Sequence, residues 1–148
     1  MILGFTGTSK GMTQRQRATV RYLLGELQVT ELHHGDCVGA DAEVHELGRE
    51  LSLRVIVHPP SDSKHRAFCG LNGRSLNYIL DPRPYLVRNR DIVAASIDGI
   101  IGAPKDFIQP KSLRRQGTWT TVGYARQAGR HLWLVFPDGT FREDNKVK

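Results

Sequence analysis

The segment of residues 4–13, GFTGTSKGMT, places glycine, hydroxyl and lysine residues directly after the apolar residues 1–3. Glycines let backbone N–H groups approach a ligand closely, and a lysine near a helix N-terminus adds positive charge. This combination suits phosphate or a similar anion, although it matches neither the Walker A motif nor the G-x-G-x-x-G dinucleotide motif. A tight strand-to-helix turn with a solvated lysine is the structural alternative. The candidate ligand-contacting residues are Thr6, Gly7, Thr8, Ser9, Lys10 and Gly11.

A second turn of the same kind, HHGDCVGAD, occupies residues 33–41. Its aspartates would either cap the following helix or hydrogen-bond a ligand hydroxyl, and both alternatives stay open. A metal held by His33, His34, Asp36 and Cys37 is disfavoured because the spacing matches no common zinc site and no second cysteine pair exists, so we predict no metal. The candidate ligand-contacting residues are His34, Gly35, Asp36, Gly39 and Asp41.

Two further motifs begin helices in the second half of the chain. In the sequence VRNRDIV, the guanidinium of Arg88 could clamp a phosphate beside Asn89, although such residues on a helix are often only solvated. Gly117 and Thr118 again place a glycine and a hydroxyl at a helix N-terminus, and Trp119 could either stack on a base or pack in the core. The sequence identifies no catalytic residue with certainty, and the weak candidates are Asp41 and Glu43.

Short β-branched runs alternate with longer amphipathic ones, which is typical of βαβ units. We therefore predict an α/β fold, with one doubly wound, mainly parallel sheet and helices on both faces. Thr13 and Gln16 form a capping-box pattern that predicts a helix start directly after the first loop. The predicted strands are 2–6, 30–34, 53–58, 98–103 and 131–136, and the predicted helices are 13–27, 40–51, 84–96 and 117–128. Residues 137–148 are predicted to form a small hairpin or a flexible tail.

The positive charge of the chain is concentrated in two long connections. The net charge is +6; residues 59–90 hold six basic and two acidic residues, and residues 104–116 hold four basic and one acidic residue. Both segments follow predicted strands, and ligands of open α/β sheets bind beyond the carboxyl ends of the strands. A basic rim at this place favours an anionic ligand.

Length and composition restrict the class of protein. A chain of 148 residues with 39% hydrophobic residues fits one domain, 1–148, and has no apolar run long enough to span a membrane. No secretory signal is recognisable, so we expect a cytoplasmic protein. Cys37 and Cys69 are too few for a disulfide framework and are expected to be free thiols.

Taken together, the four motifs GFTGTSKG, HGDCVGAD, RNRDIVAAS and GTWTTVGYARQAG resemble the SLOG superfamily of Rossmann-like proteins, which includes the DNA-processing protein DprA and the LOG nucleotide phosphoribohydrolases. The resemblance extends over residues 2 to about 136. It implies a nucleotide pocket and, from the way such domains pair, a homodimer. The chain departs from the LOG element G-G-x-G-T-x-E-E, because Gln116 replaces a glycine and neither glutamate is present. The pocket residues that the resemblance implies are Gly7, Thr8, Gly35, Gly39, Asp41, Arg88, Gly117 and Thr118.

Three functions are compatible with these observations. The first is a sensor or sequestering protein that binds a phosphorylated nucleotide or nucleotide derivative and requires no cofactor. The second is a nucleotide hydrolase that cleaves an N-glycosidic or phosphate bond, for which the missing glutamates are a difficulty. The third is a DprA-like module for single-stranded DNA, in which the basic connections would contact phosphates.

Overall fold

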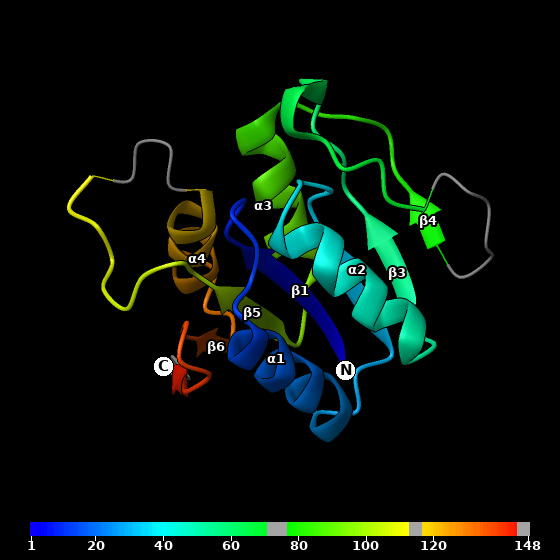
Figure 1. Ribbon diagram of the computed structural model, residues 1–148. Helices are drawn as coiled ribbons and strands as arrows, with labels where there is room; N and C mark the ends of the chain where they lie inside the picture. The colour runs from blue at the N-terminus through cyan, green and yellow to red at the C-terminus, as the bar shows by residue number, and fades with distance from the viewer. Residues whose placement is uncertain (71–76, 113–116, 145–148) are drawn as a thin grey trace.

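The computed structural model describes residues 1–70, 77–112 and 117–144, which form a seven-stranded sheet in the order β4-β3-β2-β1-β5-β6-β7 (Figure 1). All neighbouring strands of this sheet are parallel except β6 and β7. The strands are β1 (Ile2–Gly7), β2 (Glu31–His34), β3 (Arg54–Val57), β4 (Asn77–Ile79), β5 (Gly99–Ala103), β6 (Leu132–Val135) and β7 (Phe141–Asp144). The helices are α1 (Gln14–Glu26), α2 (Ala40–Glu50), α3 (Tyr85–Ala95) and α4 (Gly117–Gln127), with a 3₁₀ turn at Ser63–His65.

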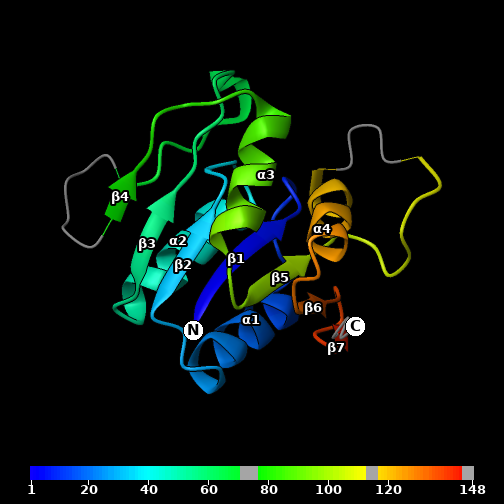
Figure 2. The same ribbon diagram turned by 180° about the vertical axis from the view of Figure 1, so that it is seen from behind.

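Helices cover both faces of the sheet. Helices α1 and α2 lie on one face, and α3 and α4 lie side by side on the other (Figures 1 and 2). One apolar cluster fills the space under α1 and α2, and a second, which includes Trp119 and Val122 of α4, lies under α3 and α4. The predicted doubly wound, mainly parallel α/β fold is confirmed. No helix of the described residues has the length and apolar character that a bilayer crossing requires.

The order of the strands reverses at β1. From β1 the chain passes through α1 to β2 on one side, whereas α3 leads to β5 on the other side of β1. The connections that leave the carboxyl ends of β1 and β5 therefore turn to opposite faces of the sheet. Such a switch point leaves a crevice in which ligands of open α/β sheets bind.

The structure differs from the predicted elements in the connection of residues 59–83. This segment contains β4, whose residues Asn77 and Ile79 pair in parallel with Val55 and Val57 of β3. A strand of three residues is too short to produce a recognisable alternation, and its pairing depends on β3 being in place. At the other end of the sheet, β7 pairs antiparallel with β6. The sequence predicted a small hairpin or a flexible tail for residues 137–148, of which residues 145–148 lie outside the described part of the chain.

The predicted capping box at the start of α1 is also confirmed. The hydroxyl of Thr13 accepts a hydrogen bond from the backbone of Gln16 at 3.0 Å, and the Gln16 side chain accepts one from the backbone of Thr13 at 3.2 Å. The buried Gln16 amide also donates to the carbonyl oxygens of Pro104 and Val135 at 2.8 and 2.9 Å. One side chain therefore links the start of α1 to the residue that follows β5 and to the last residue of β6.

Candidate functional site

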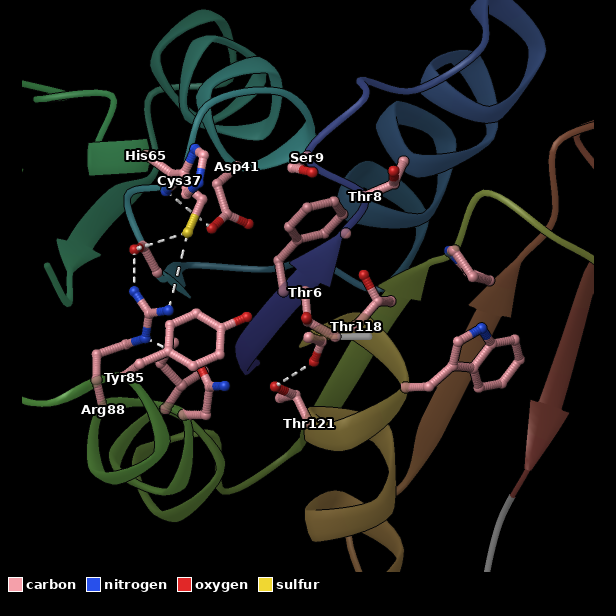
Figure 3. Close-up of a pocket in the computed structure, with 18 of the residues that line it drawn as sticks. Thr6, Thr8, Ser9, Cys37, Asp41, His65, Tyr85, Arg88, Thr118 and Thr121 are labelled. Atoms are coloured by element: carbon pink, nitrogen blue, oxygen red, sulfur yellow. Dashed lines mark hydrogen bonds between the residues drawn. The ribbon is translucent and has the colours of Figure 1, made fainter. Parts of the chain in front are cut away.

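A cavity of about 650 Å³ opens at the carboxyl ends of the central strands, next to the N-termini of α3 and α4 (Figure 3). This volume is within the range of small-molecule binding sites. The four sequence motifs, which are far apart along the chain, meet around it. The predicted residues that line the cavity are Thr6, Gly7, Thr8, Ser9, Lys10, Gly35, Asp41, Arg88, Asn89, Gly117, Thr118 and Trp119.

Nine lining residues were not among the predicted contacts. Lys64 and Lys105 belong to the two basic connections, so the charge distribution was the signal that could have found them. No feature of the sequence indicates Tyr85, because its position at the cavity depends on how α3 packs against α4. The nine residues are Phe5, Cys37, Lys64, His65, Tyr85, Ile92, Pro104, Lys105 and Thr121.

The first loop uses most of its backbone N–H groups for its own structure. The N–H of Lys10 donates to the Thr8 hydroxyl at 3.1 Å, and the N–H of Gly11 donates to the Thr8 carbonyl at 3.1 Å. The N–H of Met12 donates to a carboxylate oxygen of Glu43 at 2.6 Å. These groups cannot form the backbone cradle for phosphate that the sequence suggested. Gly11 and Glu43 do not line the cavity, so Glu43 is placed as a support of the loop rather than beside a ligand.

Gly39 joins the second loop to the first. Its φ angle is +90°, and a Cβ at this position would lie 2.4 Å from the carbonyl oxygen of Ser9 and 2.7 Å from that of Thr8. The next N–H, that of Ala40, donates to the Thr8 carbonyl at 3.0 Å. Gly39, which the sequence predicted as a ligand contact, therefore packs loop against loop and does not line the cavity.

The substitution Gly39→Ala should lower the free energy of unfolding by about 3 kcal/mol, since it adds left-handed backbone strain to a clash with main-chain atoms. Urea denaturation measures the effect. Gly25→Ala is the matched control, because Gly25 lies in α1 with open space around its Cα, and it should raise stability by about 0.5–1 kcal/mol. Similar stabilities for the two variants would contradict the packing role of Gly39.

Asp36 also has a structural position. Its carboxylate accepts hydrogen bonds from Nε of Arg66 at 2.7 Å and from the N–H of Cys69 at 2.8 Å. The side chain is fully buried and does not line the cavity. Asp36 therefore holds residues 66–69 against the second loop, and it is not positioned to contact a ligand as the sequence predicted.

Asp41 lines the cavity, and its contact with a ligand stays a prediction. Its side chain is 6% exposed, and one carboxylate oxygen accepts the N–H of Cys37 at 3.1 Å. The other oxygen, Oδ1, has no hydrogen-bond partner. Burial raises the pKa of the Asp41 carboxyl to about 6, although Arg88 acts in the opposite direction. Figure 3 shows this carboxylate on the same side of the cavity as Cys37 and Tyr85.

Arg88 lines the cavity, but most of its N–H groups bind the chain itself. Nη1 donates to the carbonyl oxygen of Gly35 and, at 3.1 Å, to that of His58. Nε donates to Oδ1 of Asn89 at 2.8 Å, and Nη2 lies 3.8 Å from the sulfur of Cys37. A bidentate grip on phosphate needs two free N–H groups in the same plane. Arg88 therefore supports the second loop through Nη1, and its contact with a phosphate stays a prediction.

The N-terminus of α4 forms another wall of the cavity. Thr118 and Thr121 line it, and the Thr121 hydroxyl donates to the Gly117 carbonyl at 3.1 Å (Figure 3). Trp119 is only 3% exposed and belongs to the apolar cluster under α4, so it is unsuited to stacking on a base. Tyr85 also lines the cavity, and its side chain is exposed. Its hydroxyl lies so close to Gly117 that a Cβ at position 117 would be 2.0 Å away from it.

His34 is completely buried and does not line the cavity. Together with His45 and Cys69 it forms a group whose ligand-type atoms lie within 4.8 Å of one another. Nδ1 of His34 accepts the N–H of Asp36 at 3.0 Å, so its proton is on Nε2, which donates to Nδ1 of His45 at 2.9 Å. A metal ligand needs a free lone pair, and both nitrogens of His34 are engaged. The residues form a hydrogen-bonded histidine pair and do not fit a metal ion.

The same fold occurs in solved structures. TM1055, a target of the Northeast Structural Genomics Consortium, matches with a TM-score of 0.62 and 12% sequence identity over 88% of this chain and 71% of that chain. DNA processing protein A from Helicobacter pylori, solved to study its single-stranded DNA binding mode, matches with a TM-score of 0.57 and 18% identity over 89% of this chain. The chain has the DprA-like Rossmann-type fold that the SLOG resemblance implies.

The present chain spans 63% of the length of the Helicobacter pylori protein. No protein-family model matches the chain, and no curated protein matches it. The comparisons therefore establish the fold, and the ligand has to be inferred from the cavity.

Proposed function

We propose that the chain binds a phosphorylated nucleotide or nucleotide derivative in this cavity and acts as a sensor or sequestering protein. The observation that carries the proposal is the convergence of four polar motifs, three of which contain glycine, on one cavity at the switch point of the sheet. Lys10, Lys64 and Lys105 give the cavity a basic lining, whereas Asp41 is the acidic residue among the described residues that line it. This charge distribution suits a ligand that is anionic at one end and neutral but polar at the other.

The first experiment is a thermal-shift panel of the protein with nucleoside mono-, di- and triphosphates, ADP-ribose, NAD and a short single-stranded oligonucleotide. A ligand at a hundredfold excess over its dissociation constant stabilises the native state by about 2.7 kcal/mol. Chromatography of the same mixtures shows whether the ligand is recovered intact. Intact ligand supports a sensor or sequestering protein, whereas conversion indicates the hydrolase, for which Asp41 is the carboxyl group at the cavity.

Single-stranded DNA binding is the second candidate, and the fold shared with DNA processing protein A favours it. Two arginines of the first basic connection are engaged within the chain: Arg66 pairs with Asp36 at 2.7 Å and Arg83 pairs with Asp91 at 3.2 Å. Arg74, Arg114 and Arg115 lie outside the described residues. A thermal shift with the oligonucleotide and with no small nucleotide would favour this function over the first.

Lys10→Ala should weaken binding of the nucleotide by about 1 kcal/mol, or roughly fivefold, since a charge pair at an exposed lysine has a modest energy. Isothermal titration calorimetry measures the change. Lys111→Ala removes the same charge from an exposed position outside the cavity and should leave the affinity unchanged. Equal affinities of the Lys10 variant and the unmodified protein for the nucleotide would show that Lys10 does not contact the phosphate.

A further inference from the structure

Two residues that line the cavity each have a buried side-chain polar atom that lacks a partner within the described part of the protein. Among the described residues, unpartnered buried side-chain atoms are Oδ1 of Asp41, Nδ2 of Asn89 and Nε2 of His45, and the first two residues line the cavity. Asp41 and Asn89 are 6% and 4% exposed. An unsatisfied buried polar group is costly, so such groups in native proteins usually pair with a ligand or water.

The partner of Asp41 has to be a neutral hydrogen-bond donor. A carboxylate repels phosphate, and Arg88, the nearby cation, already donates to the carbonyl oxygens of Gly35 and His58. A ligand that contains phosphate would therefore present another part of its structure to Oδ1 of Asp41. Sugar hydroxyls and amino groups are the neutral donors that a nucleotide offers.

The partner of Asn89 has to be an acceptor. Nε of Arg88 donates to Oδ1 of Asn89, and this hydrogen bond fixes the orientation of the amide. The NH₂ group of Asn89 is consequently the end that has no partner. A hydroxyl group is able to donate to Asp41 and to accept from Asn89, whereas an amino group is only a donor.

We propose that Asp41 and Asn89 recognise the vicinal hydroxyls of a ribose, and that the cavity therefore selects ribonucleotides over 2′-deoxyribonucleotides. This inference rests on the proposed nucleotide-binding function and specifies its ligand class. The phosphate is then left to the lysines of the lining, Lys10, Lys64 and Lys105, because the buried carboxylate repels it. A 2′-deoxy ligand would leave a buried polar atom unpaired, which is the arrangement that gives strong discrimination between otherwise similar ligands.

Isothermal titration calorimetry of the full chain with AMP, GMP, CMP and UMP, each beside its 2′-deoxy counterpart, tests the inference. We expect the preferred ribonucleotide to bind at least about tenfold more tightly than its deoxy form. Asp41→Asn, which retains the size of the side chain, should reduce this ratio to below about threefold. Lys10→Ala is the control, because it should weaken both forms equally and leave the ratio unchanged.

Equal affinity of the unmodified protein for a ribonucleotide and its deoxy form would overturn the inference and leave nucleotide binding intact. This comparison needs no variant, so it does not depend on the folding of a substituted protein. An unchanged ratio in Asp41→Asn, with its fold verified by circular dichroism, would also overturn the role of Asp41. Absence of binding to all eight monophosphates and to the di- and triphosphates, ADP-ribose and NAD of the thermal-shift panel would overturn the proposed function together with the inference.

Discussion

Lowering the pH from 7 to 5 should reduce the free energy of unfolding, because His34 and His58 are buried in the neutral form. They are 0% and 5% exposed. Burial, followed by neighbouring positive groups, places the pKa of His34 well below its usual value and lowers the pKa of His58 to about 3. In the unfolded chain both regain a pKa near 6.5.

The direction of this pH effect on stability follows from which state, folded or unfolded, binds more protons. A histidine whose pKa is lowered in the folded state contributes stability above pH 6.5, and this stability is lost as the pH falls below that value. At pH 5 the loss is about 2 kcal/mol for His58, whose folded pKa of about 3 lies below this pH, and His34 adds a further loss in the same direction. Asp41 acts in the opposite direction. Because its pKa is raised to about 6, its protonation in the folded state adds about 1 kcal/mol to the free energy of unfolding over the same interval.

The hydrogen bonds explain why protonation is costly. Nδ1 of His34 accepts the N–H of Asp36, so a proton on that nitrogen would face another donor. Nε2 of His58 lies 2.8 Å from Nδ1 of His33.

Urea denaturation at pH 7, 6 and 5 measures the effect of pH on stability. His58→Gln, which retains a donor toward His33, should make the pH dependence weaker, whereas the exposed His65→Gln should not change it. Constant stability over this interval would show that the histidines are not held neutral.

Arg88→Ala should lower the free energy of unfolding by about 3–5 kcal/mol, since it removes a buried charge and leaves its partners unpaired. The guanidinium satisfies the carbonyl oxygens of Gly35 and His58 and orients Asn89. It also favours the charged form of Asp41. The variant should therefore lose stability whether or not a nucleotide is present.

Arg90→Ala is the matched control for Arg88→Ala, because it lies on the same helix but is exposed, with its guanidinium 4.0 Å from the ring of Tyr124. It should cost about 1 kcal/mol or less. Urea denaturation of both variants gives the comparison. If Arg88→Ala retained full stability and lost only nucleotide affinity, the guanidinium would be a ligand contact after all.

Local spacing was sufficient to predict the elements that carry the site. The glycine-containing turns after β1 and β2, and the capping box of Thr13 and Gln16, involve residues close together in the sequence, so their physical effects are visible there. Parallel strands bring their carboxyl ends to one edge, and four motifs that follow this rule were predicted to meet. Twelve of the predicted residues line the cavity, and their contacts with a ligand remain a prediction.

Only the tertiary structure decided what each polar group binds. Arg88 donates to the carbonyl oxygens of Gly35 and His58, which lie 53 and 30 positions away in the sequence. Asp36 accepts a hydrogen bond from Arg66, which is also 30 positions away. Helix packing also decides between the two alternatives for Trp119, because it buries this side chain, and it leaves Tyr85, for which the sequence predicted no role, exposed at the cavity. Residue type and spacing determine which groups need partners, but a long-range hydrogen bond depends on distances that exist only after the sheet and helices have packed.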